Sequence, residues 1–256
     1  MRLKARVTVG AATAALLPAL LMGVTGCSSK DAPAPGRTPD PKGSAPAGSP
    51  TAPPGGAPSG PAAPKAAASK LERSALEQGD LVDYQISAQG KNPNAPDGQP
   101  QADRKACQPL ADIMGDKPDP AARETVNRGI GSQKQVGLAV SASVSSYAES
   151  DAKALTARLR SAVAACATGF TATVEKQSGT YREVRPAEYR TTGDETVSWT
   201  TTAAAQGVSA QVHVVVVRQG DTVVRLMALN VAGARQKVLV PQEVTDKQLE
   251  KVRGAG

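Results

Sequence analysis

Three cysteines and one histidine are the residues of this 256-residue chain whose types could support nucleophilic, redox or metal chemistry. Redox pairs usually lie close together in sequence, whereas Cys27, Cys107 and Cys166 are far apart. His213 lies in an expected strand, with Gln211 and Val215 on the same face. It could act as a catalytic base, but a histidine that only points from a sheet face is the simpler interpretation.

The sequence lacks the local signatures of several enzyme classes. It contains no Gly-x-Ser-x-Gly elbow, no GxGxxG stretch and no Walker A motif. Asp116, Asp119 and Glu124 are acidic neighbours without the spacing of a calcium loop. The acids within Gly193–Glu195 could be a catalytic pair, but a turn with solvated carboxylates is simpler. We therefore expect no enzyme activity, no cofactor and no metal, with carboxylate-dependent hydrolysis as an open alternative.

Cys27 closes the stretch Val24–Cys27, which follows three basic residues within the first six and an apolar run over 7–22. This order of features is typical of an export signal. The stretch resembles the lipobox of bacterial lipoproteins, which implies that residues 1–26 are removed and that the Cys27 sulfur carries a diacylglyceryl group. Two acyl chains suffice for stable anchoring to a membrane. An uncleaved transmembrane helix is the alternative.

The segment that follows Cys27 has the composition of a tether. Residues 28–68 contain eleven Pro, six Gly and eleven Ala, too little apolar surface to offset chain entropy. We expect a disordered linker over 27–68 and one folded domain over 69–256. The formal charge is +7, and removal of the three basic residues of the signal leaves +4. Without a basic stripe with interleaved aromatic residues, nucleic acid is not an expected partner.

The two remaining cysteines, Cys107 and Cys166, form an even pair in an exported protein, for which a disulfide is the default expectation. Each lies on the apolar face of an expected helix, so a bridge would join two helices. Two buried free thiols are the alternative, and a redox-active pair is a weaker one.

Hydrophobic periodicity and turn residues outline the domain. A helix, a strand, two further helices around a second strand, then consecutive strands and a last helix indicate an α+β fold. We expect an antiparallel sheet with helices packed on one face. The expected helices are 69–78, 103–114, 146–166 and 241–252, the expected strands are 81–87, 134–147, 170–174, 181–190, 196–204, 208–218 and 222–231, and 116–132 is expected to be a polar loop.

Several short motifs recur in the order found in a known family. They are Gly79–Tyr84, Cys107–Ala111, Ser145–Tyr147, Cys166 with Phe170, Gly193–Glu195 and Gln219–Asp221. Over most of 71–252 the chain resembles the extracytoplasmic sensor-like domains of actinobacterial lipoproteins, related to the PknH-type sensor domain of Ser/Thr protein kinases. The resemblance implies a disulfide-stapled α+β domain with a ligand-binding groove. A kinase domain has no counterpart in the sequence, so signalling would require a partner protein.

These features together predict a lipoprotein at the extracytoplasmic face of the cell membrane. Its domain is expected to bind a small ligand or an envelope protein, as a sensor does. A structural or assembly role in the envelope is the alternative, in which the surface rather than a pocket does the work.

Overall fold

The computed structural model describes residues 68–90, 98–230 and 238–255. The predicted signal sequence, Cys27 and the tether up to residue 67 lie outside the described residues. The helices are α1 (Lys70–Ser74), α2 (Gln108–Met114), α3 (Glu149–Ala165) and α4 (Gln242–Gly254), and a short 3₁₀ helix covers Lys105–Cys107. The strands are β1 (Tyr84–Gln89), β2 (Gln101–Ala102), β3 (Glu124–Ser132), β4 (Leu138–Ser146), β5 (Phe170–Val174), β6 (Gln177–Pro186), β7 (Glu195–Ala205), β8 (Val208–Gln219) and β9 (Thr222–Asn230).

The described strands form one antiparallel sheet of nine strands in the order β1-β3-β4-β9-β8-β7-β6-β5-β2. Five of the eight neighbouring pairs in this order are consecutive in sequence, and tight turns join β5 to β6, β7 to β8 and β8 to β9. The predicted α+β class with an antiparallel sheet is confirmed. Within the described ranges, no helix combines the length and the apolar composition needed to cross a membrane.

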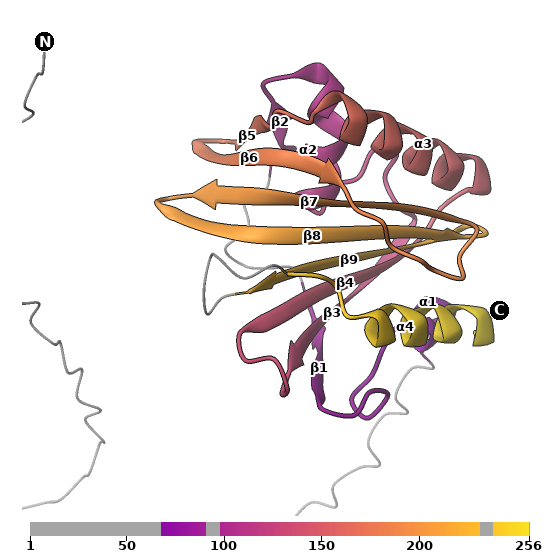
Figure 1. Cartoon of the computed structure of the whole chain (residues 1–256). Coiled ribbons are helices and arrows are strands. Elements are labelled where there is room, and N and C mark those ends of the chain that lie inside the picture. The colour runs from indigo at the N-terminus through magenta and orange to yellow at the C-terminus, as the bar shows by residue number, and fades with distance from the viewer. Residues whose placement is uncertain (1–67, 91–97, 231–237, 256) are drawn as a thin grey trace, which may run out of the picture. The chain divides into compact units, whose positions relative to one another are not determined.

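The helices lie on both faces of the sheet, not on one face as expected. Figure 1 shows α2 and α3 on one side of the strands, and α1 and α4 on the other. Alternate residues of β8 face the two cores: Val214 and Val216 pack with α3, and Val215 and Val217 pack with α4. A strand buried on both faces reads as a continuous apolar run, which is the pattern of this segment.

Strand β3 occupies part of the segment that was expected to be a polar loop over 116–132, so that expectation is wrong. Val126, Arg128 and Ile130 alternate toward the core. The buried Arg128 interrupts the apolar alternation expected of a strand. Its charge has partners in the protein interior: its Nε donates to the Leu76 carbonyl at 2.7 Å and its guanidinium pairs with Glu72. Because β3 pairs with β1 and with β4, it places β1 at the edge of the sheet.

A disulfide joins Cys107, at the start of α2, to Cys166, which ends α3. The two Cα atoms are 5.8 Å apart, and both residues are fully buried. Leu110, Phe170 and Trp199 belong to the same buried cluster. The bridge therefore lies inside the core on the α2 and α3 side of the sheet.

Candidate functional site

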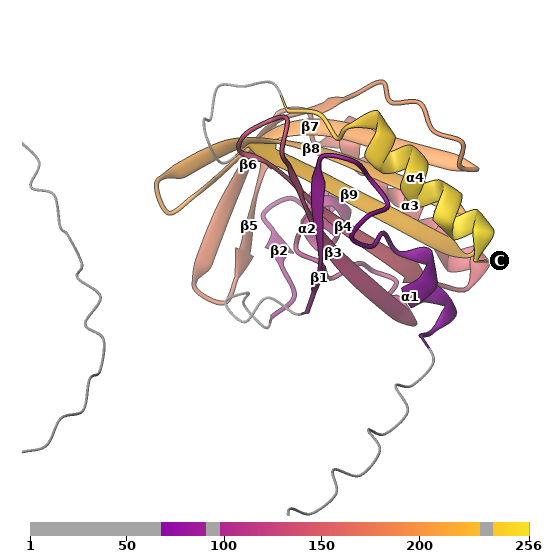
Figure 2. The same ribbon diagram turned by 90° about the horizontal axis from the view of Figure 1, so that it is seen from below.

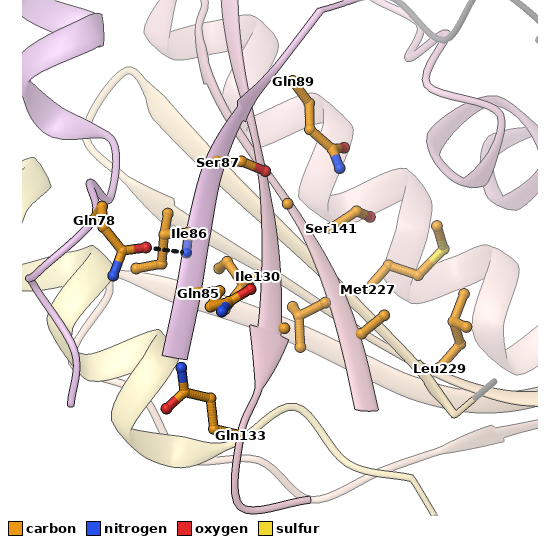
Figure 3. A pocket seen from close by; sticks show the side chains of 14 residues that line it. Gln78, Gln85, Ile86, Ser87, Gln89, Ile130, Gln133, Ser141, Met227 and Leu229 are labelled. Atoms are coloured by element: carbon orange, nitrogen blue, oxygen red, sulfur yellow. Dashed lines mark hydrogen bonds between the residues drawn. The ribbon is translucent and has the colours of Figure 1, made fainter. Parts of the chain in front are cut away.

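An open groove of about 670 Å³ lies on the α2 and α3 face of the sheet, across strands β1, β3, β4 and β9. Met227 and Leu229 of β9 pack against the core that contains α3, which fixes the face on which the groove lies. Figure 3 shows the side chains that line it, from the β1 edge to β9. The lining residues are Gln78, Gln85, Ile86, Ser87, Gln89, Gly129, Ile130, Gly131, Gln133, Ala139, Val140, Ser141, Met227 and Leu229.

The groove exists because small residues stand side by side in the sheet register. Gly131 lies opposite Gln85 of β1 and opposite Ala139 of β4. A Cβ atom added at Gly131 would meet nothing within 4 Å. One added at Gly129 would collide with the amide of Gln89, which lies over that glycine. Because these two glycines of β3 have no side chains, the sheet has a trough here in which backbone is exposed.

Amide side chains form the rim of the groove. Gln85, Gln89 and Gln133 are exposed and free to turn toward a ligand. Gln78 is held in place, because its Oε1 accepts from the Ile86 backbone N–H at 2.8 Å (Figure 3) and its Nε2 donates to the Tyr84 carbonyl at 3.3 Å. The Ser141 Oγ in the groove wall has no hydrogen-bond partner in the described part of the chain.

No ionisable side chain is among the described residues that line the groove. Arg225 lies on β9, the strand that contributes Met227 to the groove. It is 6% exposed and turned toward α2. Its guanidinium donates to the Ile113 carbonyl at 2.7 Å and to the Ser143 Oγ at 2.6 Å, and it pairs with Asp116 at 3.1 Å. Burial lowers the pKa of Arg225. The groove can therefore offer neutral hydrogen bonds and apolar contact, but no proton transfer.

The residues singled out from the sequence lie elsewhere. His213 is fully buried on the opposite face, under the segment that leads into α4. Its Nδ1 accepts from the Val240 N–H at 2.8 Å, so its Nε2 carries the proton and donates to the Ser198 Oγ at 2.8 Å. Burial lowers the pKa of His213 to about 4. The neutral imidazole thus links the sheet to the residues before α4 through two hydrogen bonds.

The buried histidine should make the stability depend on pH. Its pKa is about 4 when folded against 6.5 for the free side chain, so the unfolded chain takes up the proton first as the pH falls. The contribution of neutral His213 to the free energy of unfolding should be fully present above pH 6.5, and the free energy of unfolding should be lower by about 2 kcal/mol at pH 5. Urea unfolding at the two pH values measures this difference. In His213→Gln, which removes the single histidine of the chain, most of the pH dependence should vanish; an unchanged dependence would contradict the assignment.

The acidic residues do not converge on one site. Asp116 pairs with Arg225, Asp119 pairs with Arg158 at 3.0 Å, and Glu124 accepts from the Ser69 hydroxyl at 2.7 Å. The residues that the structure describes contain no cluster of three His, Cys, Asp or Glu side chains that could hold a metal ion.

The acids of Gly193–Glu195 clamp a single buried arginine. Arg218 is 7% exposed, and its guanidinium contacts Asp194 and Glu195 at 2.9 Å each. Glu195 also accepts from the Thr156 hydroxyl of α3 at 3.0 Å, which ties the helix to the sheet. The expectation of a simple turn with solvated acids misses this clamp, because the arginine partner follows more than twenty residues later in the sequence.

None of the groove residues was singled out from the sequence. The available signal was alternation: Gln85, Ser87 and Gln89 share one face of β1, and Gly129 and Gly131 share the matching face of β3. Without β3 among the expected strands, these two sets could not be placed next to each other.

Comparisons with known proteins find likeness in solved structures only. No family model matches the chain, and no curated protein sequence matches it. The crystal structure of the extracellular domain of PknH from Mycobacterium tuberculosis is similar with a TM-score of 0.45 and 11% identity, over 73% of this chain and 94% of that chain. An uncharacterized protein from Mycobacterium smegmatis is similar with a TM-score of 0.37 and 10% identity, over 68% and 90%. Likeness at this level does not decide the function of the chain.

Proposed function

We propose that this chain is a lipid-anchored binding protein of the extracytoplasmic membrane face, whose domain holds an uncharged ligand in the groove. The observation that carries the binding role is the lining: about 670 Å³ of open space bordered by amides, hydroxyls and bare backbone, without an ionisable group among the described lining residues. Pockets of this size suit small ligands. Cys27 supplies the anchor in this proposal, and a partner protein would be needed to pass a signal across the bilayer.

The lining indicates the chemical class of the ligand. Each glutamine amide both donates and accepts hydrogen bonds, so it complements hydroxyl groups and other amides equally well. Met227 and Leu229 offer an apolar floor for the carbon skeleton of the ligand. An envelope saccharide that carries N-acetyl groups has all three features: hydroxyls, amides and an apolar ring face. We therefore infer a neutral acetamido sugar as the ligand class.

The groove can be filled from within to test this proposal. Gly131→Leu should lower the affinity for tri-N-acetylchitotriose at least tenfold, because the new side chain enters open space in the trough. The fold should tolerate the change, since Gly131 does not have a left-handed backbone and strands favour larger residues. Isothermal titration calorimetry of the full chain in detergent micelles measures the binding.

Two controls sharpen the experiment. Thr202→Val on β7 changes a strand residue outside the groove and should bind the trisaccharide as the parent protein does. The de-N-acetylated trisaccharide, which has ammonium groups in place of amides, should bind more weakly than the acetylated form. Equal binding by Gly131→Leu and the parent protein, or no binding by the parent protein, would refute the proposal.

A further inference from the structure

A second cleft, of about 690 Å³, lies at the end of the sheet where β1 begins and β3 ends. We call it the tyrosine cleft, because Tyr84 and Tyr189 both line it. Its other walls come from the turn between β3 and β4, the segment between β6 and β7, and the residues that lead into α4. It shares no lining residue with the groove, so the two sites can be tested independently.

Charges of both signs line the tyrosine cleft, in contrast to the neutral groove. Lys134 and Arg190 are the cations, and Glu188 and Glu243 are the carboxylates. Lys134 pairs with Asp83 at 2.7 Å, an exposed contact that leaves it available to a ligand. No described residue pairs with the Arg190 guanidinium or the Glu188 carboxylate. Two opposite charges on one wall of the cleft are thus without a partner in the described part of the chain.

The tyrosines give the tyrosine cleft a fixed wall. The Tyr84 hydroxyl donates to the Glu243 Oε1 at 2.7 Å. Burial, together with this contact, raises the pKa of Tyr84 and keeps the phenol protonated. The Tyr189 hydroxyl lies 2.8 Å from the Thr245 Oγ1 and 3.1 Å from the Val240 carbonyl. Because both hydroxyls are held by the protein, the rings are positioned before a ligand arrives. Leu239, 46% exposed, adds apolar surface beside them.

We infer that the tyrosine cleft binds a short peptide whose amino and carboxyl ends are both free. A ligand with a single charge would meet like charges as well as opposite ones in this site. A zwitterionic peptide matches both sets, with its carboxylate toward Arg190 and Lys134 and its ammonium toward Glu188 and Glu243. The tyrosine rings and Leu239 contact its side chains. The volume suits a peptide of about two to four residues.

Peptides with one blocked end distinguish binding through both terminal charges from non-specific binding. We expect trialanine with free ends to bind the full chain in detergent micelles, as measured by isothermal titration calorimetry. N-acetyl-trialanine and trialanine amide should each bind at least tenfold more weakly, because each lacks one of the two charges. Blocked peptides that bind as tightly as trialanine, or no binding of trialanine at about 10 mM, would overturn the inference.

Charge-removing variants locate the site. Arg190→Gln and Glu188→Gln should each weaken trialanine binding at least tenfold, with unchanged thermal stability because neither side chain has a described partner. Arg123→Gln and Glu250→Gln remove charges of the same types outside the tyrosine cleft and should leave binding unchanged. Gly131→Leu should also bind trialanine normally, even if the groove proposal fails. Unchanged affinity in both Arg190→Gln and Glu188→Gln would overturn the inference.

Discussion

Replacing Cys107 and Cys166 together by alanine should lower the free energy of unfolding by about 4 kcal/mol. The bridge closes a loop with a sequence separation of 59 residues, so its loss returns considerable entropy to the unfolded chain. The effect should be large for this domain because the whole chain contains only four Tyr, one Trp and one Phe with which to fill its cores. Urea unfolding of the variant and of the parent protein measures the difference.

The single variant Cys107→Ala is the matched control for the double variant. It also removes the bridge, and it leaves the Cys166 thiol as a small buried side chain. Both variants should therefore lose a similar amount of stability. A loss below about 1 kcal/mol in the double variant would show that the bridge contributes little, contrary to the chain-entropy estimate.

Cys27→Ser should abolish lipid attachment. We expect this substitution to change the location of the protein more than any other. A serine hydroxyl cannot form the thioether that the proposed diacylglyceryl group requires. Each methylene buried in the membrane contributes about 0.8 kcal/mol, so the loss of two acyl chains removes the whole anchor. Labelling of cells with a radioactive fatty acid, followed by membrane fractionation, detects both the lipid and the location.

The variant has two possible fates that both agree with the proposal. The protein either leaves the membrane fraction or remains as a precursor that is 26 residues longer, and neither form carries label. Cys107→Ala with Cys166→Ala should keep its label, since these two cysteines are joined to each other inside the domain. Unchanged processing and labelling of Cys27→Ser would show that Cys27 is not the attachment site.

The regular elements with strong periodicity could be predicted from the sequence. The apolar positions of α3, including Leu155 and Leu159, are buried as their spacing indicates. The run Val214–Val217 is buried on both faces. Strand β3 was missed because its Gly129 and Gly131 resemble loop residues and its Arg128 resembles a surface residue. Both features depend on partners that no local pattern contains: β1 and β4 on either side, and Glu72 of α1.

The groove was beyond prediction for a related reason. Its lining comes from four strands, and Gln85 and Leu229 at its two sides are far apart in sequence. The chemistry of its residues is also inconspicuous, because amides and glycines carry no motif. The residues that the sequence makes conspicuous, such as Asp194 and Glu195, form ion pairs with Arg218 and have a structural role. In this domain His213, Asp194 and Glu195 stabilise the fold, whereas amides, glycines and apolar residues form the groove.

The contact of Gln78 with strand β1 has a consequence for how the sheet meets neighbouring molecules. Its side-chain amide accepts from the Ile86 N–H and donates to the Tyr84 carbonyl, two of the outward backbone groups that a tenth strand would need. At the other border of the sheet, β2 has only two residues. Both borders are thus poor templates for strand addition from a neighbouring molecule. Copies held close together, as the proposed lipid anchor would hold them, should therefore not join their sheets.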